Sequence, residues 1–132
     1  MSIWKETKKV VPGFISAGLF DREGMIIEGY SDDPNFHLEH AAAAFVTLVN
    51  EADTAGNLIE LDNALEVQLT FKDAYIVLRS ISNSENGMII GLASSKDTVL
   101  GRVRMGMDFL MKKIMHSGTQ SSVTKMPSKI SG

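Results

Sequence analysis

Residues 31–54 read SDDPNFHLEHAAAAFVTLVNEADT, and the rest of the chain is organised as sheet and supporting helix around this stretch. The side chain of Asp33 is suited to accept hydrogen bonds from the free backbone N–H groups of a first helical turn. The φ angle of Pro34 is already set for the first helical position. We therefore expect a helix that begins at Asp33 and Pro34 and continues to Thr54.

The two sides of this expected helix differ. At 100° per residue, one side is an apolar stripe that should face the core, made of Leu38, Ala41, Ala42, Phe45, Leu48, Val49 and Ala52. The other side carries Phe36, His40, Ala43, Thr47, Asn50 and Glu51. The alanine run at 41–44 either lets another backbone approach closely or reflects only the high helix propensity of alanine. Charge favours the first interpretation, because every charged residue between 31 and 53 is acidic.

Length and composition limit the possible classes. A chain of 132 residues with 44% hydrophobic residues and a net charge of −3 is typical of one globular domain and not of a nucleic-acid-binding protein. The absence of cysteine excludes disulfides and thiolate chemistry and fits a reducing compartment, so we expect a cytoplasmic protein. The start MSIWKETKK lacks an apolar signal core, and no apolar run approaches the roughly 18 residues of a membrane span. We expect no membrane insertion.

The remaining sequence predicts helices and strands around the central stretch. The expected elements are a short helix from Ser2 stopped by Pro12 and Gly13, strands at 14–20, 25–30, 64–71, 74–81 and 87–93, and a closing helix that ends at Met115. Trp4 and Val11 should lie in the core. The closing helix has a stripe of Val99, Leu100, Val103, Met107, Leu110 and Ile114, and we interpret its methionines at 107, 111 and 115 as core. A domain at 1–116 and a flexible basic tail at 117–132 follow from this interpretation.

The sequence offers little catalytic or metal chemistry. His37 and His40 are three residues apart, but zinc needs at least three protein ligands and no other cluster supplies them. Neither a phosphate-binding glycine loop nor a nucleophile motif is present, so we expect no cofactor, no catalytic residue and no intrinsic GTPase activity. Asp21 and Glu23 are interpreted as turn residues of a hairpin.

The order of these elements resembles that of the roadblock/dynein light chain (Roadblock/LC7-type) domain family. The resemblance spans about residues 2–115. Its most specific parts are VPG at 11–13 leading into a strand that ends DREG at 21–24, and SSKDTVLGRVR at 94–104. The departures from the family pattern are a shortened first helix and the added basic tail.

The resemblance implies an α/β (α+β) fold of the profilin-like or longin-like kind. Its five-stranded, mostly antiparallel sheet would carry the two terminal helices on one face and the middle helix on the other, within a homodimer. It implies either a non-enzymatic regulator or scaffold of a small Ras-like GTPase or an architectural light-chain-type subunit. Arg22 is either an arginine finger for such a partner or an ordinary surface residue beside two acids.

Two surfaces are expected to make these contacts. The partner should bind over the middle helix, at Phe36, His40, Ala43, Ala44, Thr47 and Asn50. A second copy of the chain should bind along the strand at 64–71, an edge without proline. The expected dimer residues are Ala44, Leu48, Leu65, Val67 and Leu69.

Overall fold

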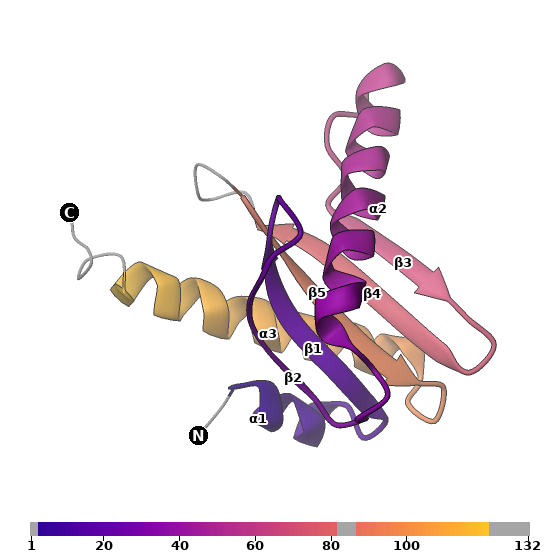
Figure 1. The fold of residues 1–132 in the computed structure, drawn as a ribbon, viewed down its shortest axis with the longest axis vertical. Helices are drawn as coiled ribbons and strands as arrows, with labels where there is room; N and C mark the ends of the chain where they lie inside the picture. Colours follow the sequence, from indigo (N-terminus) through magenta and orange to yellow (C-terminus); the bar gives the residue numbers. More distant parts are fainter. Residues whose placement is uncertain (1–2, 82–86, 122–132) are drawn as a thin grey trace.

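The computed structural model describes residues 3–81 and 87–121, which form a five-stranded sheet covered by helices (Figure 1). The elements are α1 (Ile3–Val10), β1 (Phe14–Asp21), β2 (Ile26–Ser31), α2 (Leu38–Leu58), β3 (Glu66–Thr70), β4 (Ala74–Ile81), β5 (Met88–Ser95) and α3 (Leu100–Ser121). The strand order is β2-β1-β5-β4-β3, and all neighbouring strands are antiparallel. The expected fold class is confirmed.

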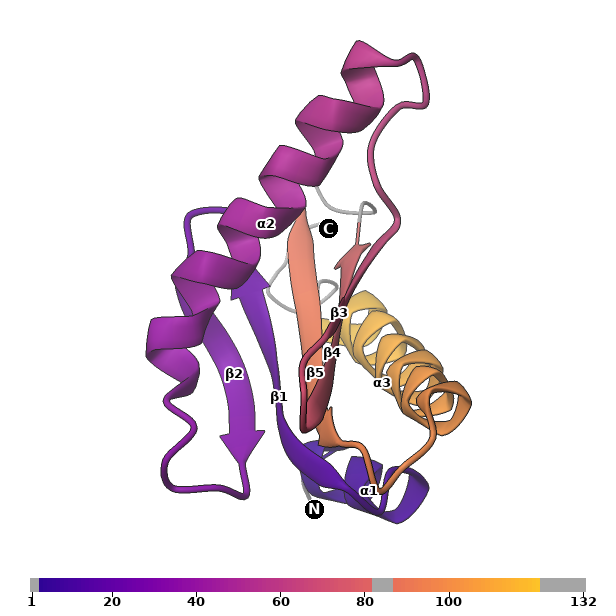
Figure 2. The same cartoon turned by 90° about the vertical axis from the view of Figure 1, so that its right-hand side faces the viewer.

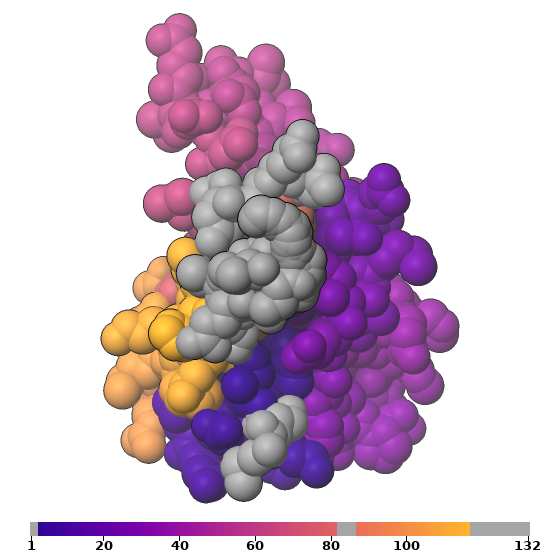
Figure 3. Space-filling view, turned by 90° about the vertical axis from the view of Figure 1, so that its left-hand side faces the viewer, coloured from indigo at the N-terminus to yellow at the C-terminus, as the bar shows by residue number. Residues whose placement is uncertain are grey.

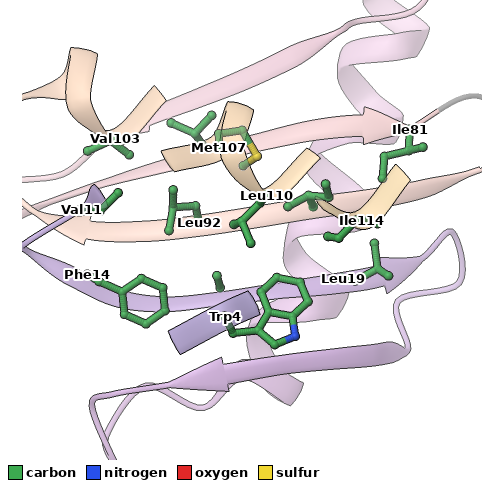
Figure 4. Packing of buried hydrophobic residues seen from close by; sticks show 13 residues of the cluster. Trp4, Val11, Phe14, Leu19, Ile81, Leu92, Val103, Met107, Leu110 and Ile114 are labelled. Carbon is green, nitrogen blue, oxygen red and sulfur yellow. The ribbon is translucent and has the colours of Figure 1, made fainter. Parts of the chain in front are cut away.

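The sheet is covered on both faces. The helices α1 and α3 pack on one face and α2 crosses the other (Figure 2). The predicted core residues Trp4, on α1, and Val11, just after it, are both buried in the cluster on this face, together with Met107 and Leu110 of α3 (Figure 4). Because β1 and β5 lie in the middle of the sheet with helices on both sides, almost all their side chains are buried, which explains their nearly continuous apolar sequences.

The start of the middle helix differs from the prediction. The helix α2 begins at Leu38, not at Asp33 and Pro34, and its N-cap residue His37 makes no side-chain capping bond. The Oδ1 atom of Asp33 instead accepts a hydrogen bond from the backbone N–H of Asn35 at 2.9 Å. An Asp-Pro pair suits a turn as well as a helix start, and here the turn wins.

The ends of other elements also differ from the prediction. Leu48 was expected in the core stripe but is exposed, whereas Val46 is buried against the sheet. Val99 precedes α3 and is exposed, and Met115 is also exposed, so only Met107 of the three methionines is fully buried. The helix α3 continues to Ser121, beyond the predicted end. Residues 122–132 of the expected tail lie outside the described residues.

Candidate functional site

The helix α2 lies only partly on the sheet. Its first half packs through Leu38, Ala42 and Phe45, and its C-terminal end runs past the sheet (Figures 1 and 2). In the space-filling view, this end and the segment that follows it stand clear of the body of the molecule (Figure 3). We call residues 59–65, which connect α2 to β3, the α2–β3 link.

Five of the six residues predicted to bind a partner lie together on the exposed side of α2. They are His40, Ala43, Ala44, Thr47 and Asn50. Phe36 is not on the helix, because it precedes the corrected start of α2. It is half-buried, and its carbonyl oxygen accepts a hydrogen bond from the hydroxyl of Ser31 at 3.2 Å. A hollow of about 360 Å³, lined by Asn35, Phe36, His37, His40 and Ala41, lies where this segment enters the helix.

The alanine run has a structural role as well as an open surface. Gly24, in the turn between β1 and β2, has a φ of 90° and comes so close to α2 that a Cβ atom built on it would lie 3.2 Å from the Cα of Ala43. The close approach explains the glycine at position 24, because a side chain there would press on the backbone of α2. Ala43 and Ala44 are both exposed.

Arg22 is held against the body of the molecule. Its Nη1 atom donates to Oδ1 of Asn50 at 2.9 Å and lies 3.3 Å from Oδ2 of Asp53, and its Nη2 atom donates to the hydroxyl of Ser80 at 3.3 Å. The guanidinium joins the β1–β2 turn to α2 and β4. This geometry disfavours the arginine-finger interpretation, because a finger must be free to reach a partner's phosphate. It also means that Asn50 is already hydrogen-bonded within the chain.

The strand β3 forms one edge of the sheet. The N–H of Phe71 donates to the carbonyl of Ala74, and the N–H of Ser80 donates to the carbonyl of Leu65. Because hydrogen-bonded pairs alternate along an antiparallel ladder, the backbone groups of odd-numbered β3 residues face β4 and those of Gln68 and Thr70 face the open edge. This edge is the one on which the sequence places a dimer contact.

The predicted dimer residues occupy two different environments. Leu65 and Leu48 are exposed, with 82% and 38% of their surfaces accessible. Val67 and Leu69 are half-buried against the core cluster under α2. Val67 and Leu69 therefore hold the strand against the core under α2. The outward backbone groups of β3 and the exposed leucines are available for contact with a second copy.

A group of exposed aliphatic residues at the end of α2 was missed by the sequence reasoning. Leu58, Ile59 and Leu61 expose 78%, 64% and 72% of their surfaces. The stretch 56–63 reads as a polar connection, yet three large aliphatic side chains within four positions of such a connection were the signal that could have identified them. Together with Leu65 they form an apolar set along the α2–β3 link.

An ionic network fixes β3 to α3 on the opposite face of the sheet. Glu66 accepts hydrogen bonds from Nε of Arg79 at 2.7 Å and from Arg104, and Arg79 also pairs with Asp108. Partial burial alone would raise the pKa of the Glu66 carboxyl. The hydrogen bonds from the two arginines outweigh this effect and hold the pKa below its ordinary value. Ion pairs of Glu66 with Arg79 and Arg104 therefore fix the edge strand on the face of the sheet that α3 covers.

The structure gathers no metal centre within residues 3–81 and 87–121. The rings of His37 and His40 lie 5.3 Å apart, and no third ligand joins them among the residues described. In the same part of the chain, no helix has an apolar stretch long enough to cross a bilayer.

No protein-family model matches the sequence, and no match was found among curated proteins. Solved structures do resemble it. The Roadblock/LC7 domain from Streptomyces avermitilis gives a TM-score of 0.74 at 16% identity over 87% of this chain and 93% of that one. Myxococcus xanthus MglB gives 0.72 at 15% identity over 86% and 93%. Acanthamoeba castellanii profilin IA gives 0.55 at 12% identity over 89% and 99%. These similarities confirm the expected fold and the resemblance to Roadblock/LC7 domains.

Proposed function

We propose that this roadblock-like chain is a cytoplasmic, non-enzymatic, homodimeric regulator or docking platform of a small Ras-like GTPase. The observation that carries the proposal is the exposed outer side of α2, a surface of small and polar side chains beside an open strand edge. The resemblance to the Roadblock/LC7 domain and to MglB supports a small GTPase as the partner class.

Charge supports a basic partner surface. The helix α2 contains no lysine or arginine, and Glu39 and Glu51 are exposed on it. A one-signed field of this kind steers an oppositely charged partner and fades as salt is added. We therefore expect association with the GTPase to be fast at low ionic strength and slower at high ionic strength.

Self-association would complete the open side of the molecule. The outward backbone groups of Gln68 and Thr70 offer hydrogen bonds to another strand. The exposed Leu48, Leu61 and Leu65 add apolar surface that a second copy would bury. Two α2 helices brought side by side in a dimer would also combine their acidic fields.

The docking surface is tested best at Thr47. This residue is exposed on the outer side of α2, and its hydroxyl bonds only to its own helix, at the carbonyl of Ala43. Thr47→Arg adds bulk and reverses the local charge, so it should weaken binding of the cognate small GTPase at least about tenfold, measured by calorimetry. Ala43 is a poorer site for this test, because its backbone lies close to Gly24 of the β1–β2 turn.

Met105→Arg is the matched control, since it adds the same side chain at an exposed position of α3 on the opposite face. It should bind the GTPase normally. Normal binding by Thr47→Arg together with lost binding by Met105→Arg would contradict the proposal, because it would show that the partner binds on the face of α1 and α3. Measuring GTP hydrolysis in the same samples separates a regulator, which changes the rate, from an architectural subunit, which binds without changing it.

The edge strand is tested by proline. Gln68→Pro removes an N–H that faces the open edge and should produce a monomer, whereas Gln68→Ala should leave the dimer intact, as judged by sedimentation. A proline at Val67 would instead break a bond to β4 and damage the sheet itself. A wild-type protein that sediments as a stable monomer at micromolar concentration would contradict the proposed homodimer.

A further inference from the structure

The α2–β3 link adopts a conformation that its residues rarely take. Glu60 and Asp62 have φ angles of 63° and 68°, in the left-handed region. Glycine takes this conformation readily and asparagine and aspartate do so more often than other residues, so the strain falls mainly on Glu60, which its surroundings must hold. The link must therefore be fixed by contacts from elsewhere in the chain.

Hydrogen bonds tie this link to the last turns of α2, and three of them reach beyond its first two residues. The N–H of Leu61 donates to the carbonyl of Gly56 at 2.7 Å, and Nδ2 of Asn57 donates to Oδ1 of Asn63 at 2.8 Å. The N–H of Ala64 donates to Oδ1 of Asp53 at 2.8 Å. The link thus folds back along the helix, and its end next to β3 is held by a carboxylate.

Asp53 connects three parts of the molecule. One carboxylate oxygen accepts the bond from Ala64, immediately before β3, and the other lies 3.3 Å from Arg22 in the β1–β2 turn. Only 16% of the Asp53 side chain is exposed. Each oxygen has its own partner, so a single side chain on α2 orients both the turn and the start of the edge strand.

We infer that Asp53 is a positioning residue for self-association. By holding Ala64, it fixes where β3 leaves the link, so that the open edge and the exposed leucines of the link face a second copy in one arrangement. This inference rests on the proposed homodimer. Asp53 belongs to neither core cluster, so its loss should loosen the link while the sheet core stays packed.

The two contacts of the Asp53 carboxylate, with the Ala64 N–H and with Arg22, can be separated by substitution. Asp53→Ala removes both contacts and should raise the dimer dissociation constant at least about tenfold, because the partly buried N–H of Ala64 loses a charged acceptor. Asp53→Asn keeps an oxygen acceptor for the N–H of Ala64. Arg22→Ala removes the contact between Asp53 and Arg22 and leaves the bond from Ala64 in place. Both should dimerise within about threefold of the wild type.

Amide exchange supplies a readout that general destabilisation does not mimic. In Asp53→Ala, exchange at the Ala64 amide should speed up while the amides of β1 and β5 keep their protection. Glu51→Ala is the matched control, because Glu51 is exposed on the same helix two residues away. It should change neither dimerisation nor exchange at Ala64.

Three results would overturn the inference: Asp53→Ala dimerising like the wild type, Glu51→Ala weakening the dimer equally, or protection falling throughout the sheet. The last result would make Asp53 a general support of the fold. If the wild type itself is a monomer, the proposed homodimer fails. The exchange rate at Ala64 then decides by itself whether Asp53 fixes the start of β3.

Discussion

The two faces of the sheet are covered in different ways. On the face of α1 and α3, Val11, Val103, Met107 and Leu110 are completely buried. On the face of α2, similar aliphatic side chains are buried only in the first part of the helix, and those at its far end, such as Leu58 and Leu61, are left in solvent. The helices α2 and α3 are similar in length, at 21 and 22 residues, but the extent of their contact with the sheet is not.

This difference distinguishes a helix that stabilises the fold from a helix whose exposed end is available to another molecule. The helix α3 packs on the sheet as far as Ile114 and completes a core, whereas α2 runs beyond the sheet and carries its apolar end away from the chain's own core. An exposed apolar set of this kind marks a surface for another molecule. The same type of substitution should therefore have different consequences on the two faces.

The largest difference should come from truncating a leucine on each face. Leu110→Ala leaves a cavity in the core and should lower the free energy of unfolding by about 2–5 kcal/mol. Leu61→Ala should change the unfolding free energy of the monomer by no more than about 0.5 kcal/mol while weakening the dimer. Urea unfolding of each variant under dissociating conditions measures the first quantity, and sedimentation measures the second. Equal losses of monomer stability would remove the distinction between the faces.

A smaller difference should appear between two glycines. In Gly56→Ala, the added Cβ atom would overlap the backbone oxygen of Asp62, so the link must shift, at a cost of about 1–3 kcal/mol. In Gly101→Ala, on α3, no heavy atom lies within 4 Å of the new Cβ, and the substitution should stabilise the chain by up to about 1 kcal/mol. Thermal unfolding of the pair tests both signs. An unchanged melting temperature in Gly56→Ala would show that the α2–β3 link is not packed tightly against Gly56.

The smallest expected effect concerns acid. Because the folded-state pKa of Glu66 lies below its ordinary value, the charged carboxylate stabilises the fold fully above the ordinary glutamate pKa of about 4.3. This contribution is lost as the pH falls through the lowered folded-state pKa. Glu66→Gln should cost about 1 kcal/mol at neutral pH and flatten the decline in stability below pH ~4. The exposed Glu51→Gln should leave the profile unchanged, and an equal flattening there would refute the assignment to Glu66.

The sequence predicted the elements whose burial is simple. The central strands were recognisable because coverage on both faces requires apolar side chains throughout, and the turn at 21–24 was recognisable because Asp21 caps it, accepting bonds from the N–H groups of Glu23 and Met25. The start of α2 was predicted wrongly, because the pair Asp33-Pro34, which also suits a helix start, forms a turn here. Local signals of this kind give the element type more reliably than its ends.

The candidate site was predictable only in part. The exposed side of α2 follows from helical periodicity, which placed His40, Ala43 and Thr47 on it, and all three are exposed. The partners of Arg22 lie 28 and more residues away along the chain and depend on how the helix crosses the sheet. The exposed leucines of the link were overlooked because periodicity does not describe a loop.

The strand order also governs how the chain assembles as it is made. The strand β1 pairs with β5, the last strand of the chain, so the central seam of the sheet closes only after residue 95 has been synthesised. Until then the chain holds the hairpin β1–β2 and the pair β3–β4, which α2 and the α2–β3 link connect. A nascent copy with an unclosed seam can accept β5 from a neighbour, so exchange of strands between copies competes with folding within one chain.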